Sequence, residues 1–256
     1  MRRLPWWAEL VIAVVTYELY NAVQSLTSGS IRQADAHGRA ITSFEHDVHI
    51  WIESSVNRFA TAHHYVGLVG GYYYELAHVT VTLGVLAYLW RRRPDVYALL
   101  RNTLLGLSLV ALLVYWLWPV SPPRFVVSGL TDTLVRNDIL GAAHVHEGLV
   151  NLYAAMPSLH VAWATWCAAA VVLTQRSRWR HLAWGYPLLT TVAVVATANH
   201  YVIDALAGAA LAGVALAMAV RWTNRHWMAE KATDRRMAET AGRNNDRGGS
   251  DYPPKG

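Results

Sequence analysis

Two residues near the end of the chain have the types and spacing of a nucleophile and its orienting partner. His200 and Asp204 are four residues apart, so on a helix they lie next to each other on one face. A carboxylate in that position can accept a hydrogen bond from one imidazole nitrogen, which fixes the tautomer and leaves the other nitrogen free to attack. A capping or purely structural Asp–His pair has the same spacing, so the pair alone leaves both interpretations open.

A second group of polar residues precedes another apolar stretch. Pro157 and Ser158 are typical of a helix start, because proline fits the first turn and serine caps it well. The free N–H groups and positive dipole end of a helix N-terminus suit a phosphate group. His160 in the first turn could then protonate a leaving oxygen. Considered alone, an ordinary helix start is the simpler explanation of the Pro-Ser pair.

A third region supplies a cation. Arg124 follows two prolines, which restrict the conformation of its loop. A guanidinium can hold a phosphate through two hydrogen bonds, although an interfacial anchor explains a single arginine equally well. Together the three regions indicate a site where a histidine attacks a phosphate ester, provided that the fold brings them to one place.

The composition indicates that a membrane protein positions these residues. Hydrophobic residues make up 54% of the 256-residue chain and charged residues only 15%, against about 25% in a soluble domain. The 12 Trp and 13 Tyr suit the two membrane interfaces. The net charge of +5 does not indicate a nucleic-acid partner, because the basic residues form short clusters between apolar stretches. A single cysteine, Cys167, excludes a disulfide framework and a paired-cysteine metal site.

Six apolar stretches qualify, or nearly qualify, as membrane-spanning helices, each of which needs about 20 residues. We therefore expect an all-α, polytopic membrane helical bundle with six transmembrane helices. The chain begins Met-Arg-Arg like a signal peptide, but no convincing small-residue cleavage site follows, so we expect the first helix to be retained. The expected spans are residues 6–26, 65–90, 99–118, 159–173, 182–198 and 201–220.

Two further segments differ from the spans. Residues 41–60 have apolar side chains at helical spacing, with Glu45 and Glu53 largely elsewhere, which predicts an interfacial amphipathic helix. A packed loop helix is the alternative. Residues 229–256 are polar and contain Gly and Pro, so we expect a disordered cytoplasmic tail after a membrane domain of residues 1–228.

The positive charges predict the orientation. With six spans, 17 of the 22 Lys and Arg residues fall on the side that holds both termini, which is therefore expected to be cytoplasmic. Arg124, Ser158, His160, His200 and Asp204 then all lie at the opposite, extracytoplasmic face, at similar depth. We expect a multi-pass protein of the cell membrane whose site faces outward.

At these residues the sequence resembles the type 2 phosphatidic acid phosphatase superfamily. The matching text is Ala-Met-Pro-Ser-Leu-His at 155–160 and Asn-His-Tyr-Val-Ile-Asp at 199–204. The family signatures are a Lys/Arg-bearing motif ending in Arg-Pro, then Pro-Ser-Gly-His, then Ser-Arg-x5-His-x3-Asp. The motif-bearing region covers roughly residues 119–213, and the pattern of spans extends the resemblance over most of the chain.

The resemblance implies a role for each candidate residue. His200 would attack phosphorus and form a phosphohistidine, with Asp204 orienting it, and His160 would protonate the leaving group. Arg124 and Ser158 would hold the phosphate. The implied chemistry needs no metal and no cofactor, and the implied substrate is a phospholipid or an isoprenoid phosphate. The sequence leaves the oligomeric state open.

The chain departs from the family pattern at three points. Leu159 replaces the signature glycine, Val194 stands where an arginine is expected, and the lysine of the first motif is missing. These departures resemble the branch related to inositol phosphorylceramide synthase, which has Pro-Ser-Leu-His and lacks that arginine. Members of that branch transfer or hydrolyse a phosphorylated lipid headgroup. With fewer cations available, Arg136 is a candidate for balancing the phosphate charge.

Other hypotheses remain open at this stage. Three histidines could serve a bis-histidine haem carrier, and an intramembrane polar site could serve a small-molecule transporter. The sequences His63-His64 and His144-x-His146 lack the carboxylate or cysteine spacing of a metal site. Residues 72–74 and His78 either line a headgroup pocket or pack at the interface. The histidines that could ligate haem are His78, His160 and His200.

Overall fold

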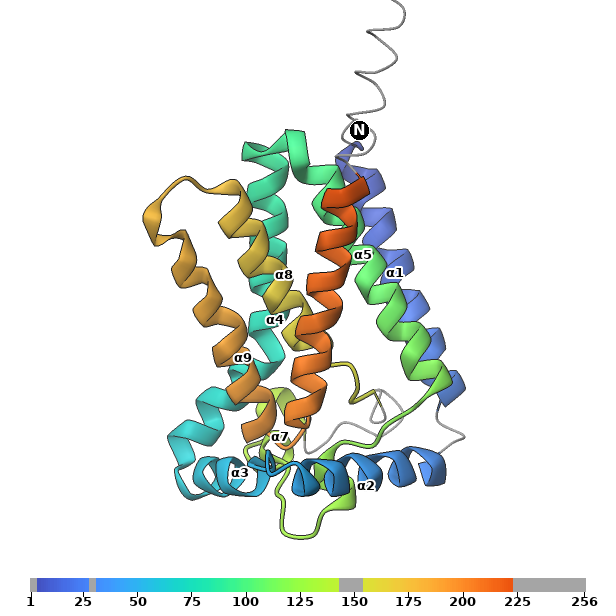
Figure 1. Cartoon of the computed structure of the whole chain (residues 1–256), viewed down its shortest axis with the longest axis vertical. Coiled ribbons are helices and arrows are strands. Elements are labelled where there is room, and N and C mark those ends of the chain that lie inside the picture. Colours follow the sequence, from blue (N-terminus) through green and yellow to red (C-terminus); the bar gives the residue numbers. More distant parts are fainter. Residues whose placement is uncertain (1–3, 28–30, 143–153, 223–256) are drawn as a thin grey trace, which may run out of the picture. The chain divides into compact units, whose positions relative to one another are not determined.

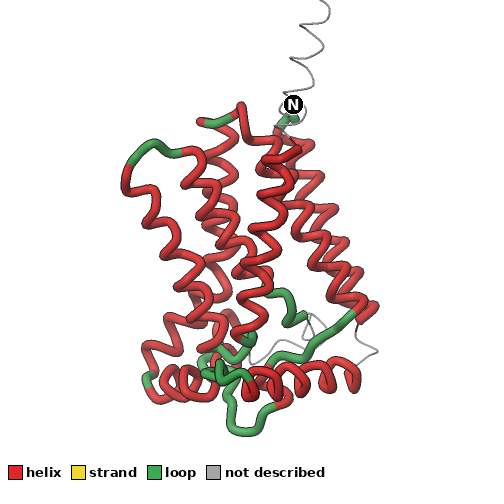
Figure 2. Tube along the Cα trace, in the orientation of Figure 1, coloured by secondary structure: helices red, strands yellow, loops and turns green. Residues whose placement is uncertain are grey.

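The computed structural model describes residues 4–27, 31–142 and 154–222, and within these ranges the fold is all-helical, as predicted (Figure 2). The chain divides after Leu216 into two compact units, and all the candidate site residues belong to the first. The predicted tail, residues 229–256, lies outside the described residues. The boundary expected at residue 228 therefore stays a prediction.

Figure 1 shows the order of the helices along the chain. Long helices run alongside one another, and α2 and α3 lie across one end of them. The helices are α1 (Trp6–Thr27), α2 (Ile31–Asp47), α3 (Glu53–Ala62), α4 (His64–Arg92), α5 (Pro94–Leu117), α6 (Pro123–Val126), α7 (Thr133–Arg136), the 3-10 turn Ile139–Gly141, α8 (Leu159–Thr174), the 3-10 helix Arg178–Trp184, α9 (Gly185–Ala196) and a last helix, Val202–Trp222.

The expected spans coincide with helices, but not all of these have the dimensions of a membrane span. Of the described helices, α5 and the last helix are long and apolar enough to cross a membrane by length and composition. Helix α8 has 16 residues, and α9 has 12 and continues from a 3-10 helix. The total of six membrane spans therefore stays a prediction.

The prediction of one continuous amphipathic helix over residues 41–60 is wrong. The segment is divided between α2 and α3 by a break at which His49 has a φ of 60°. The acidic and the large apolar side chains do lie on different faces, because Glu45 and Glu53 are fully buried while Phe44 and Phe59 are 48% and 56% exposed. The acidic side chains point into the protein, where they accept hydrogen bonds, and large apolar side chains point outward.

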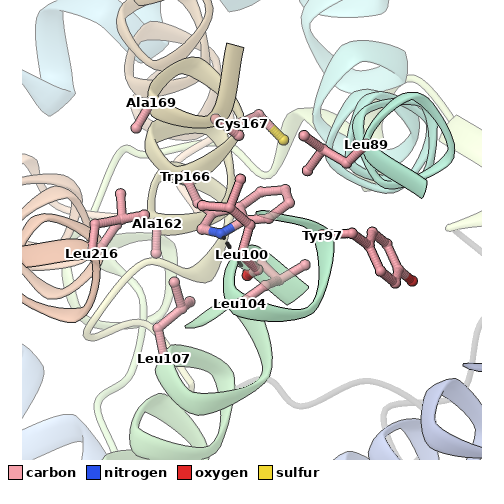
Figure 3. Close-up of a cluster of buried hydrophobic side chains, with 12 residues drawn as sticks. Leu89, Tyr97, Leu100, Leu104, Leu107, Ala162, Trp166, Cys167, Ala169 and Leu216 are labelled. Atoms are coloured by element: carbon pink, nitrogen blue, oxygen red, sulfur yellow. Dashed lines mark hydrogen bonds between the residues drawn. The ribbon is translucent and has the colours of Figure 1, made fainter. Parts of the chain in front are cut away.

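The main hydrophobic core lies where α8 packs between its neighbours (Figure 3). Trp166 is fully buried, and its indole N–H donates to the carbonyl of Leu100 on α5 over 3.1 Å. Cys167 lies beside it and is 2% exposed. This core joins α4, α5, α8 and the last helix, and so fixes the helices on which the candidate site residues sit.

Close helix packing depends on one of two glycines in the last helix. A Cβ atom added to Gly208 would lie 2.3 Å from the carbonyl oxygen of Ser158, whereas one added to Gly213 would meet nothing within 4 Å. Of these two glycines, Gly208 is therefore the one that close packing requires. There the last helix passes directly against the start of α8.

Candidate active site

The turn between α9 and the last helix places His200. Ala198 has a φ of 56°, a left-handed conformation that a non-glycine residue adopts at a cost of roughly 1 kcal/mol. The amides of Asn199 and His200 both donate to the carbonyl of Val194, at 3.2 and 3.3 Å. The chain reverses sharply here, which brings the His200 ring, only 4% exposed, into the protein interior.

The hydrogen bonds of His200 fix its tautomer. Nδ1 lies 2.8 Å from the carbonyl oxygen of Ala155 and 3.5 Å from Oδ2 of Asp204. Because a carbonyl oxygen can only accept, Nδ1 carries a proton, and in the neutral ring Nε2 holds the free lone pair. The structure thus adds Ala155 as the nearer acceptor beside the expected Asp204. That lone pair is what a nucleophilic histidine needs.

His160 lies close to His200, although the two residues come from different elements. It sits in the first turn of α8, and its ring centroid is 5.7 Å from that of His200. Two α4 side chains border the ring, Tyr74 stacked at 4.2 Å and His78 edge-on at 4.3 Å. Three histidines and a tyrosine therefore gather around one point.

The segment before α8 is held from both sides. Ala154 forms a parallel bridge with Val120, and the amide of Ala155 donates to the carbonyl of Val120 over 3.2 Å. On α5, the Tyr115 hydroxyl donates to the carbonyl of Pro157 over 2.6 Å. These contacts fix the Ala155 carbonyl that the His200 ring needs.

Ser158 is placed as the cap of α8. Its hydroxyl accepts from the amide of Val161 over 3.5 Å, its own amide donates to the carbonyl of Asp204 over 3.0 Å, and the residue is fully buried. This is the ordinary helix-start role that the Pro-Ser pair allows. The interaction with the Asp204 carbonyl joins the start of α8 to the start of the last helix.

Arg124 reaches the same region through the neighbour of His200. Its Nη1 donates to the side chain of Asn199, and its Nε lies 3.0 Å from Oδ2 of Asp132 in an ion pair. Burial lowers the pKa of Arg124, while the negative charge of Asp132 raises it. An arginine stays charged under such shifts, so the site has a cation beside His200. Arg136, by contrast, is exposed at the end of α7.

Two buried glutamates, whose partners sequence reasoning did not identify, hold the start of the last helix. Oε1 of Glu53 accepts from the amide of Val202, and Oε1 of Glu45 accepts from that of Ile203, each over 2.8 Å. Oδ2 of Asp204 accepts from the amide of Tyr201 over 2.9 Å. Each of the three backbone amides that follow His200 thus donates a hydrogen bond to a carboxylate. The sequence did contain one indication of this role: acidic residues in an apolar segment are costly to bury unless they have hydrogen-bond partners.

A buried amide on α3 holds a third part of the site. Nδ2 of Asn57 donates to the carbonyls of Thr131 and Ala196, and its Oδ1 accepts from the amide of Thr131, all over 2.9 Å. These bonds connect α3 to the end of α9 and to the loop that carries Asp132, the ion-pair partner of Arg124. Sequence reasoning missed this residue, because a lone asparagine carries no spacing pattern.

The remaining sequence candidates lie in different places. Tyr72 is 41% exposed, whereas Tyr73 bonds to the Thr190 hydroxyl over 2.9 Å. His63 contacts its own helix turn through the carbonyl of Phe59. His144 and His146 lie outside the described residues. Of the α4 candidates, Tyr74 and His78 are the ones that border His160.

The comparison with protein families agrees with this geometry. A sequence profile of the PAP2 superfamily matches residues 39–218, which include the second half of α2 and every candidate site residue. The chain belongs to the PAP2 superfamily. No curated protein and no solved structure matches it. Membership in the PAP2 superfamily indicates phosphatase or phosphotransferase chemistry on a phosphorylated lipid or small molecule, and with the two apolar helices it indicates a membrane protein.

Proposed function

We propose that this PAP2 protein is an integral membrane lipid phosphatase or phosphotransferase that works through a phosphohistidine on His200. One observation carries the proposal: two imidazole rings forty residues apart in sequence lie 5.7 Å apart in space, and one has a free Nε2. Arg124 supports it by placing a guanidinium beside Asn199, the residue that precedes His200.

The proposed reaction has two steps that balance in protons. Nε2 of His200 attacks phosphorus, the bond from phosphorus to the lipid oxygen breaks, and His160 gives its proton to that oxygen. Water or an acceptor alcohol then attacks the phosphohistidine, its proton passes to His160, and the bond from nitrogen to phosphorus breaks. Ala155 and Asp204 hold the imidazole in the required tautomer throughout.

Two groups would bind the phosphate during these steps. The Arg124 guanidinium balances its charge, as charge-assisted hydrogen bonds to phosphate are strong. Ser158 contributes through the start of α8, whose N–H groups and dipole favour an anion. Its hydroxyl already caps the helix, so we assign the phosphate contact to the helix start as a whole.

The finer features of the proposal follow from the sequence. The substrate is a phospholipid or isoprenoid phosphate, and the protein resembles the branch related to inositol phosphorylceramide synthase. Six spans place both termini in the cytoplasm and the site at the extracytoplasmic face, with membrane domain 1–228 and tail 229–256. We find no feature in the described residues that favours the haem-carrier or transporter hypothesis.

The test is an assay in proteoliposomes that follows phosphate release and headgroup transfer in parallel. The lipids are phosphatidic acid, an isoprenyl diphosphate and phosphatidylinositol, the last with diacylglycerol or ceramide as acceptor. We expect turnover of at least one lipid by the wild type and none by His200→Ala, with an acid-labile phosphoprotein formed by the wild type alone. Full activity of His200→Ala would refute the mechanism.

A further inference from the structure

We infer that α2 and α3 are part of the catalytic apparatus, because Glu45 and Glu53 are positioning residues for His200 that share one proton. The inference rests on the proposed function, since it concerns the residue that attacks phosphorus. It assigns to this pair of helices a task beyond contact with a membrane surface.

The two glutamates contact the start of the helix that follows the nucleophile. Glu45 comes from α2 and Glu53 from α3, and each is fully buried. Their carboxylates accept from the amides of Val202 and Ile203, which begin the last helix two and three residues after His200. A helix start leaves its first amides without intrahelical partners, and buried amides need partners. The arm formed by α2 and α3 supplies them.

An unpartnered oxygen shows where a proton must be. Oε2 of Glu45 is buried without a hydrogen-bond partner among the described residues. Glu53 already accepts from two amides, those of Val202 and Ile52, as an ionised carboxylate does. A proton on Glu45 would satisfy Oε2 by donating to Glu53, and it would remove the repulsion between two buried negative charges.

The surroundings of Glu45 favour the protonated form. Burial, the neighbouring side chain of Glu53 and the negative charge of Asp204 raise its pKa to about 8, against the lowering effect of the Ile203 amide. Two other titratable groups face the pair. Asp204 lies in the first turn of the last helix, and Tyr201 directly precedes that helix.

Loss of this proton would disturb the nucleophile. Above about pH 8 two adjacent buried carboxylates would both be charged, and repulsion would push α2 away from α3 and from the start of the last helix. The His200 ring depends on that start, because Asp204 and the neighbouring amides belong to it. A displacement of about 1 Å in a catalytic group can lower a rate about a hundredfold.

The experiment compares Glu45→Gln with Glu53→Gln, because shared protonation predicts opposite results for the two. Glutamine at 45 keeps the acceptor for Ile203 and places an N–H where the proton was. Glutamine at 53 instead places an N–H₂ group, which can only donate, against backbone amides that also donate. Rates are measured with p-nitrophenyl phosphate and dioctanoyl phosphatidic acid from about pH 6 to about pH 10, a range that spans the expected titration. Glu18→Gln is the control, since Glu18 is an exposed carboxylate on α1.

At neutral pH we expect the rate of Glu53→Gln to be about tenfold or more below that of Glu45→Gln. We also expect the wild-type rate to fall above about pH 8 and the Glu45→Gln rate not to fall there. Equal losses in both variants, or an unchanged alkaline fall in Glu45→Gln, would overturn the inference. Wild-type protein inactive at every pH would instead contradict the proposed function.

A second measurement needs no catalysis. The folded pKa of Glu45 lies above its unfolded value, so its stabilising effect is complete below about 4.5 and is lost progressively as the pH rises to about 8. The apparent melting temperature of the detergent-solubilised wild type should therefore decline over that interval more steeply than that of Glu45→Gln. Identical pH profiles for the two proteins would refute the shared proton even if no substrate were found.

Discussion

The contact between Gly208 and Ser158 makes the candidate site sensitive to a single methyl group. A Cβ at Gly208 would lie 2.3 Å from the Ser158 carbonyl oxygen, 3.2 Å from its carbon and 3.3 Å from the amide of Ala162. The obstruction is backbone, so no side chain can rotate away. The Ser158 carbonyl also accepts from the Ala162 amide over 3.0 Å, which opposes movement of the α8 start.

The size of the effect follows from these distances. Ordinary contact begins at 3.4 Å, so the last helix and the start of α8 must separate by about 1 Å in Gly208→Ala. Overpacking of this kind costs about 1–3 kcal/mol, against a gain in helix propensity of up to about 1 kcal/mol. His160 lies on one of the two separating elements and His200 beside the other. We therefore expect activity to fall about a hundredfold.

The matched control is Gly213→Ala on the same helix, where an added Cβ meets nothing within 4 Å. Both variants are compared with the wild type by rate of phosphate release and by thermal unfolding in detergent. Gly213→Ala should keep wild-type activity and gain up to about 1 kcal/mol of stability. Wild-type activity in Gly208→Ala would show that the close approach does not set the geometry of the two histidines, and would refute the reasoning.

Three further predictions follow from individual contacts. His160→Asn should abolish turnover of alkyl phosphates such as phosphatidic acid yet retain much of the rate with p-nitrophenyl phosphate, whose leaving group needs no proton. His200→Ala should lose activity with both substrates. Equal losses with the two substrates in His160→Asn would exclude the role of His160 as an acid. Asn57→Asp removes the donor to two buried carbonyls. It should lower the free energy of unfolding, measured by denaturation in detergent, by about 2–4 kcal/mol. An unchanged free energy of unfolding would contradict the bridging role of Asn57. Cys167 should react with a maleimide only after unfolding, since it is 2% exposed, and rapid labelling of the native protein would contradict the packing of α8.

The sequence allowed the fold class and the local motifs to be predicted, because both depend on short-range patterns. Apolar stretches become helices whatever they contact, and Ser158 caps α8 as its residue type predicts. Family membership is confirmed for a region that includes His160 and His200. By contrast, the carbonyl of Ala155 is a backbone group 45 residues away from the ring it contacts, so no residue type could indicate it.

The arm formed by α2 and α3 shows a more general limit of sequence patterns. In water, an apolar helix face turns toward the protein, and the hydrophobic pattern therefore tells which side is buried. Next to lipid the outside is also apolar, so the same pattern no longer distinguishes the two faces. Here Phe44 and Phe59 face outward. Glu45 and Glu53 face inward, because they accept hydrogen bonds from backbone amides at the start of the last helix. The partners of an inward face, not its hydrophobicity, decided the orientation.

The two histidines differ in how firmly they are held, and this difference suits their proposed tasks. The turn before His200, the carbonyl of Ala155 and the capped start of the last helix all restrain the nucleophile. The contacts described for His160 are ring contacts with Tyr74, His78 and His200. A phosphoryl group held directly between the rings would need more than the 5.7 Å between their centroids. The attack distance of about 3 Å, the bond from phosphorus to the ester oxygen and a hydrogen bond of about 2.8 Å would have to fit between the ring nitrogens, which lie inside that centroid distance. The ester must therefore bind beside both rings or move the less restrained one, and His160 is the ring whose contacts can be remade without breaking a hydrogen bond that holds the nucleophile.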